Sequence, residues 1–191
     1  KLDSSVNDFT RRYPVPGHHI YLGNTGNASR SLLFSPNFTA GFDPGFHAFD
    51  VYKWKTETAR LFNTTRPYSE INYMLGSRVE QIIELIHTQN LNPNWNVALQ
   101  YRLINSPGFF KNQKSNHNNY QLTSTFHAKN RRYHNTVIVV ANKLQSAENG
   151  GILDTSDILN DPIYKDRFNI ETRLGGDPAF GRDFFSTRIN T

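Results

Sequence analysis

Residues 95–103 alternate between apolar and polar side chains without a break, and residues 120–128 do the same. Successive side chains of an extended strand point to opposite faces, so a pattern of period two predicts a strand with one apolar and one polar face. Each run is about as long as the 9–11 residues with which a tilted β-strand crosses a bilayer. Aromatic residues lie at or near the ends of both apolar rows, as they do in membrane-spanning barrel strands.

The pattern divides the chain into three regions. Residues 1–66 are irregular and rich in turn residues, and we interpret them as an N-terminal extension or a plug. Residues 67–145 are predicted to form a β-meander of about five barrel strands, and residues 146–191 a long loop that could lead into a further strand near 168–173. Residues 79–89 fit either a helical stripe or a strand, and we favour the strand because both neighbouring segments are strands.

Connections between the predicted strands are short at 76–78, 90–94 and 129–132, and long at 105–119 and after 145. Consecutive strands of a meander alternate in direction, so both long connections are predicted at the same end of the sheet as the 76–78 turn. Outer-membrane barrels have this asymmetry, with short periplasmic turns and longer outer loops. The start of the first strand, and residues 1–66 before it, are therefore predicted to lie on the periplasmic side.

Composition narrows the classes of function. The chain of 191 residues is 37% hydrophobic, and no apolar run approaches the roughly 18 residues of a transmembrane helix. The net charge of +5 comes from scattered basic residues without a nucleic-acid-reading motif, so we expect no nucleic-acid partner. There is no cysteine, the histidines lack metal-ligand spacing, and Glu80 and Glu84 have no histidine or nucleophile at motif spacing. We expect no metal, no cofactor, no catalytic residue and no enzymatic activity.

Six short motifs resemble those of one known family. They lie at residues 21–28, 41–47, 65–70, 87–90, 105–108 and 148–151. From about residue 20 to about residue 152 the chain is similar to the N-terminal part of the Bacteroidota putative-porin family, which consists of outer-membrane β-barrels of Gram-negative bacteria. The resemblance implies an all-β fold, an antiparallel up-and-down transmembrane β-barrel with an irregular N-terminal region. Five or six strands form only part of such a barrel, because the smallest single-chain barrels use eight.

The resemblance also assigns the two faces of the alternating strands, which the alternation alone leaves open between a barrel and the solvent face of a soluble sheet. The residues predicted to face lipid are Trp95, Val97, Leu99, Tyr101, Leu103, Tyr120, Leu122 and Phe126. The residues predicted to face an aqueous lumen are Asn96, Gln100, Arg102, Gln121, Thr123, Thr125 and His127.

Three functional hypotheses follow. The first is an outer-membrane porin that lets small polar solutes diffuse passively, or a barrel subunit of a larger envelope complex. The second is a barrel plugged by residues 1–66 that acts as a scaffold. The third is a soluble β-sandwich binding module, whose apolar faces would pack on a second sheet. For the two barrel hypotheses the expected partners are outer-membrane lipid, further barrel strands and other envelope proteins.

Overall fold

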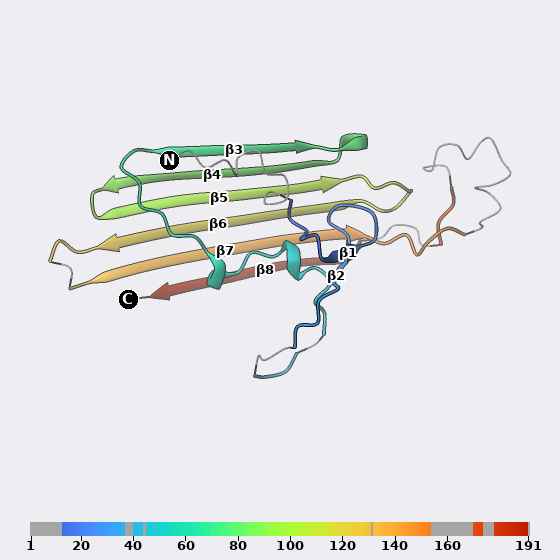
Figure 1. Cartoon of the computed structure of the whole chain (residues 1–191), viewed down its shortest axis with the longest axis horizontal. Helices are drawn as coiled ribbons and strands as arrows, with labels where there is room; N and C mark the ends of the chain where they lie inside the picture. Colours follow the sequence, from blue (N-terminus) through green and yellow to red (C-terminus); the bar gives the residue numbers. More distant parts are fainter. Residues whose placement is uncertain are drawn as a thin grey trace.

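The computed structural model describes residues 13–36, 40–43, 45–130, 132–153 and 170–173, and the backbone of residues 178–190. Its main element is a six-stranded antiparallel sheet in which the strands follow one another in chain order (Figure 1). The strands are β3 (Tyr68–Leu75), β4 (Gln81–Asn92), β5 (Trp95–Ser106), β6 (Ser115–His127), β7 (His134–Ala147) and β8 (Pro178–Asn190). The fold is therefore all-β and antiparallel, as predicted.

The sheet is not closed. Strands β3 and β8 are its two edges, and neither has a second neighbour among the described strands. This open meander is consistent with part of a barrel, because closure would require the edge strands to be paired. In the part of the chain that the structure describes, no helix is both long and apolar enough to cross a membrane.

The connections between strands lie at the ends of the sheet that their lengths predicted. Residues 93–94 and 128–133 join strands at one end, which we call the short-turn end. Residues 76–80 and 107–114 join strands at the other, the long-loop end, where the connection from β7 to β8 also begins. The 76–80 turn contains a 3₁₀ helix, η4 (Ser77–Val79), in which Arg78 and Val79 both have positive φ angles, 55° and 64°.

Several boundaries differ from the prediction. Residues 81–92 are a strand, which settles most of the ambiguous 79–89 segment in favour of β structure. Strand β6 begins at Ser115, so the predicted loop 105–119 is reduced to 107–114. Strand β8 was not predicted at all, because the Gly and Pro residues around it suggested short turns. The predicted late strand near 168–173 is wrong where it is described, since Thr172 makes only an isolated bridge with Ile152; residues 168 and 169 lie outside the described residues.

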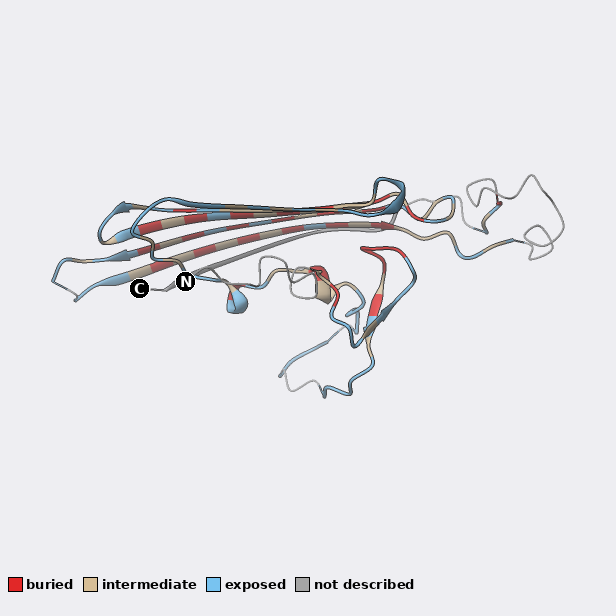
Figure 2. Cartoon of the chain, turned by 45° about the horizontal axis from the view of Figure 1, so that its top comes forward, coloured by how far each residue is buried: buried red, intermediate tan, exposed pale blue. Residues whose placement is uncertain are grey.

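The described residues of 13–60, which we call the N-terminal segment, lie on one side of this sheet, and residues 13–28 and 48–60 run closest to it (Figure 2). We call the contacted face the inner face and the opposite one the outer face. The segment contains the hairpin of β1 (His19–Tyr21) and β2 (Ser29–Ser31) and two 3₁₀ helices, η2 (Asp50–Tyr52) and η3 (Thr56–Thr58). Its anchor is a small apolar cluster in which segment residues meet three strands, comprising Val15, Tyr52, Ile82, Ile104 and Leu144. The sequence predicted residues 1–66 on the periplasmic side, whereas the described part of the segment lies along the inner face and reaches the long-loop end.

Candidate functional site: the inner face and the segment docked on it

The seven residues predicted to face a lumen all lie on the inner face. Register places Asn96 opposite Thr125, and Gln100 opposite Gln121, so their side chains share one side of β5 and β6. Six of the seven are buried, and only His127, at the short-turn end, is exposed. His127 contacts His134 across the β6–β7 pair, with 2.8 Å between the two Nδ1 atoms.

The eight residues predicted to face lipid all lie on the outer face. Trp95, Leu99, Tyr120, Leu122 and Phe126 are 38–48% exposed, and Val97, Tyr101 and Leu103 are half-buried among their neighbours. Exposure of this many large apolar side chains is unusual for a surface in water. The outer face of β5 and β6 is therefore apolar and open, whereas their inner face is mainly polar and buried, apart from the apolar cluster beneath the segment.

The first contact between the N-terminal segment and the inner face is made by a turn, residues 24–27, at the long-loop end. The amide nitrogen of Asn24 donates to the backbone oxygen of Gln113 at 2.8 Å, and Asn24 also accepts from Ser106. Asn27 accepts from Ser115 at 2.7 Å and from Ser146 at 3.2 Å. This turn contact joins the segment to β5, β6 and β7, and it leaves these buried polar groups satisfied.

His117 of β6 extends the turn contact. Its Nε2 donates to the backbone oxygen of Gly26 at 2.7 Å, while its Nδ1 accepts from the backbone N–H of Gln145 at 3.2 Å. A carbonyl can only accept and an amide N–H can only donate, so these partners fix the neutral Nε2–H tautomer. Gly26 must approach closely: a Cβ there would lie 2.8 Å from the Cβ of Ser115.

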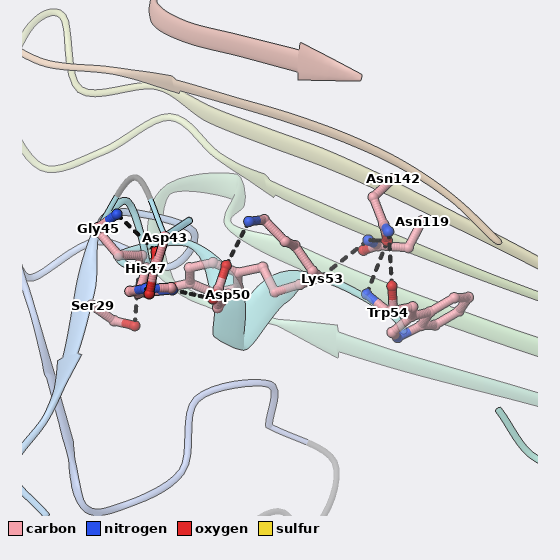
Figure 3. Close-up of polar contacts among 11 residues, drawn as sticks. Ser29, Asp43, Gly45, His47, Asp50, Lys53, Trp54, Asn119 and Asn142 are labelled. Atoms are coloured by element: carbon pink, nitrogen blue, oxygen red, sulfur yellow. Dashed lines mark hydrogen bonds and ion pairs between the residues drawn. The ribbon is translucent and has the colours of Figure 1, made fainter. Parts of the chain in front are cut away.

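The second contact lies nearer the middle of the sheet, around Tyr52 and Trp54. Asn142 of β7 accepts from the backbone N–H of Trp54 and donates to its backbone oxygen, both at 2.9 Å (Figure 3). Asn119 of β6 donates to the backbone oxygen of Tyr52 at 3.1 Å and to Asn142 at 2.5 Å. The side chain of Asn142 thus satisfies both the N–H and the C=O of Trp54, which has no strand partner to bond them.

Arg102 of β5 is the buried charge of this second contact. It donates to the backbone oxygen of Tyr52 at 2.6 Å and to Asn119 at 3.3 Å, and its guanidinium lies 5.2 Å from the centre of the Trp54 ring. Glu84 on β4 is 3.9 Å away. A buried cation is stable only when its charge and its donors are matched. Here the segment supplies the Tyr52 oxygen and the Trp54 ring, and the sheet supplies Asn119 and Glu84. Removing the segment would leave this charge without its shortest hydrogen bond and its ring contact.

Between the two contacts, the described part of the chain from β2 to η2, residues 32–36, 40–43 and 45–47, projects away from the sheet as a loop, which we call the 30–47 loop (Figures 1 and 2). The neck of the loop is closed where the N–H of Ser29 donates to the backbone oxygen of Ala48 at 2.8 Å. His47 bridges Asp43 and Asp50, with each ring nitrogen 2.8 Å from a carboxylate oxygen, and Lys53 contacts Asp50 (Figure 3).

These contacts shift two titrations in the loop. Hydrogen bonds to Asp50 and Asp43 raise the pKa of His47 above 6.5. Burial by itself raises the pKa of Asp50, but the hydrogen bonds from Lys53 and His47 outweigh it, so this pKa lies below 3.8. Among the described residues, no three His, Asp or Glu side chains form a group that could hold a metal ion.

Comparison with known proteins gives one match. Residues 1–180 match the family described as "Putative porin". The chain belongs to the putative porin family. No curated protein and no solved structure matches it. Membership in the putative porin family supports, at a coarse level, a porin-like function and a place in the outer membrane.

In this member of the putative porin family, the residues that hold the segment were largely missed from the sequence. His117 and Asn119 were placed in the predicted loop 105–119, and Asn142, although within the predicted meander, was not assigned to a face. A signal did exist in β6, since His117 and Asn119 continue the spacing of two that begins at Gln121. Glu80 and Glu84, which share no partner motif in the sequence, are separately engaged: Glu80 accepts from the N–H of Thr25 at 3.2 Å, and Glu84 faces Arg102.

Proposed function

We propose that the chain forms one side of an outer-membrane pore through which small polar solutes diffuse passively, with the N-terminal segment inside the lumen as a fixed constriction. The observation that carries the proposal is the opposite polarity of the two faces: the apolar outer face is open, and the polar inner face holds the segment. A soluble β-sandwich would bury the apolar face against a second sheet and leave the polar face in water. Family membership supports the same assignment.

The outer face has the dimensions of a lipid belt. From Trp95 to Leu103 the apolar row spans eight residue steps, or about 26 Å along the strand. At a tilt of roughly 40° this corresponds to a height of about 20 Å, close to the ~25 Å band of outer-membrane barrels. Aromatic pairs lie toward both ends: Trp95 is opposite Phe126, and the rings of Tyr101 and Tyr120 are 4.9 Å apart.

Closure of the pore requires further strands. Six strands are fewer than the eight of the smallest single-chain barrels, and an open edge of backbone donors and acceptors is unstable in lipid. We propose that β3 and β8 each pair with another barrel strand in the outer membrane of a Gram-negative bacterium, either from a longer chain or from another envelope protein. The exposed Ile71, Tyr73 and Leu75 on β3 continue the apolar belt to that edge.

One alternative has a specific observation in its favour. The N-terminal segment is held by buried hydrogen bonds to four strand residues at the turn contact alone, which fits a permanently plugged barrel that serves as a scaffold. A plug and a constriction differ in whether ions pass while the segment remains docked.

Single-channel recording distinguishes them. The protein is refolded into lipid, and conductance is measured in planar bilayers of neutral lipid in KCl. Stable ohmic steps in the wild type are expected for a pore narrowed by the segment. A closed wild type in which conductance appears only when docking is weakened, as in Gly26→Ala, would support the scaffold instead. A chain that stays monodisperse in buffer without detergent and does not enter lipid would contradict both barrel functions.

A further inference from the structure

The described residues of the 30–47 loop border an open hollow beside the β1–β2 hairpin. The hollow has a volume of about 970 Å³, and it is lined by residues of the hairpin, of 33–36, 40–43 and 45–51, and by Lys55. Because the loop is tied to the sheet through the turn contact on one side and the Tyr52–Trp54 contact on the other, the hollow keeps its place on the inner side of the wall. We infer that this hollow is a binding site for small inorganic anions such as chloride or phosphate, and that it makes the pore anion-selective. The inference rests on the proposed function.

The acidic groups of the hollow are already neutralised. Both oxygens of Asp43 accept hydrogen bonds, one from the N–H of Gly45 and one from His47, each at 2.8 Å. Both oxygens of Asp50 are likewise engaged, one by His47 and one by Lys53. Since each ring nitrogen of His47 faces a carboxylate oxygen, both must carry hydrogen, so His47 is an imidazolium in this arrangement. Two negative charges are therefore matched by two positive ones.

The two basic side chains that line the hollow have no acidic partner among the described residues. Arg30 on β2 and Lys55 before η3 both line the hollow and are exposed, and neither forms an ion pair with any residue that the structure describes. His18 and His19 add two imidazoles, which are neutral or positive but never negative. Among the described residues that line it, the hollow thus has an excess of about two positive charges, from Arg30 and Lys55, and both of its carboxylates are engaged in hydrogen bonds.

The position of the hollow brings the charges of Arg30 and Lys55 close to the proposed path of solutes. The described part of the loop extends from the segment past the β8 side of the sheet (Figure 1). In the proposed pore the wall closes around the side that carries the segment, so solutes would pass beside the loop. Charges act over about 8 Å at physiological salt, a distance comparable to the width of a small pore. Two cations at such range would enrich anions locally and repel cations.

The test is the reversal potential across a bilayer that separates two KCl concentrations, which gives the permeability ratio of chloride to potassium. The wild-type protein should prefer chloride. The double variant Arg30→Gln/Lys55→Gln should lower that ratio about two- to fivefold, and Arg30→Glu/Lys55→Glu should lower it further and favour potassium. Arg60→Gln is the matched control, because Arg60 is an exposed cation on the same segment outside the hollow, and its ratio should equal that of the wild type.

The outcomes separate the two proposals. If the wild type conducts but the double Gln variant keeps the wild-type ratio, the anion site is overturned and the pore stands. If Arg60→Gln changes the ratio as much as the double variant does, the effect is one of general charge and the site is also overturned. If the wild-type protein does not conduct at all, the proposed function and the anion site fall together.

Discussion

At the scale of single residues, docking of the N-terminal segment depends on a glycine and an asparagine. Gly26 has a φ of +91°, a conformation that favours glycine, and it lies against Ser115 and His117. Asn142 supplies the two hydrogen bonds that hold the backbone of Trp54. Each can be changed without touching the apolar outer face.

Gly26→Ala is expected to weaken docking by about 2–4 kcal/mol, because the new Cβ adds steric overlap to backbone strain. The measurement is limited proteolysis of residues 13–60 in lipid, whose rate follows the population of the undocked segment. Gly23→Ala is the control: Gly23 has a similar φ, +84°, but a Cβ there would meet nothing within 4 Å. It should cost only the strain, about 1–2 kcal/mol. Equal cleavage rates in the two variants would contradict the close contact with Ser115 and His117.

Asn142→Ala is expected to free the second contact at a cost of about 2–3 kcal/mol, since it leaves the N–H and C=O of Trp54 without their partners. The chain has two tryptophans, so in a Trp95→Phe background the fluorescence of Trp54 reports this site alone. Acrylamide quenching should increase in Asn142→Ala. Asn116→Ala, on the outer face of β6, removes an amide that accepts a hydrogen bond from Asn118 and should leave quenching unchanged. Quenching that stays at the starting level in Asn142→Ala would show that Trp54 is held by other means.

At the scale of elements, the sequence predicted a strand only where its outer row of side chains is apolar. Strands β5 and β6 were recognised where one row is apolar and the other polar, as in residues 95–103. The beginning of β6 was missed because both rows are polar there: Ser115, His117 and Asn119 bind the N-terminal segment, while Asn116 and Asn118 lie on the outer face beyond the belt. Periodicity in hydrophobicity disappears at that point although the strand continues.

Contacts between residues that are far apart in the sequence could not be predicted, for a different reason. Asn142 and Trp54 are 88 residues apart, and nothing in either local sequence predicts their pairing. Strand β8 is similar, since its definition depends on its register with β7, from Thr136 opposite Asn190 onward. The structure forms a turn at residues 24–27, and its contact with three strands could not be predicted from the local sequence.

The loop at 30–47 should respond to pH through His47 and Asp50. The pKa of His47 is raised above 6.5, so its contribution to loop stability is complete below pH 6.5 and is lost as pH rises through the folded value. The pKa of Asp50 is lowered below 3.8, so its contribution is complete above pH 3.8 and is lost as pH falls through the folded value. The contacts are therefore fully formed between pH 3.8 and 6.5.

Chymotrypsin cleavage within the loop tests this dependence, with the rate for His47→Gln divided by the wild-type rate at each pH to cancel the pH dependence of the protease. The ratio should be larger at pH 6 than at pH 8.5. A ratio that does not change with pH would mean that protonation of His47 does not stabilise the loop.

At the scale of the whole molecule, the orientation of the sheet in lipid can be tested on one strand. Leu99→Arg should reduce the free energy of folding into lipid by about 2–4 kcal/mol, because the site lies near the middle of the proposed belt. Asn105→Arg is on the same face of β5 but in the polar row at the long-loop end, and it should cost no more than about 1 kcal/mol. Reversible unfolding in urea from lipid vesicles measures both. If Leu99→Arg leaves the free energy of folding into lipid unchanged, the outer face does not lie in hydrocarbon.

The lengths of the strands indicate where the proposed pore would discriminate between solutes. β5, β6 and β7 have 12, 13 and 14 residues, more than the 9–11 that cross a bilayer. The surplus lies at the long-loop end, where Asn105, Asn116 and Gln145 form a polar outer row and the docked turn sits on the inside. In the proposed pore this surplus stands above the lipid as a collar around a water-filled vestibule. Discrimination by charge in such a vestibule fades as salt is raised, whereas exclusion by size does not.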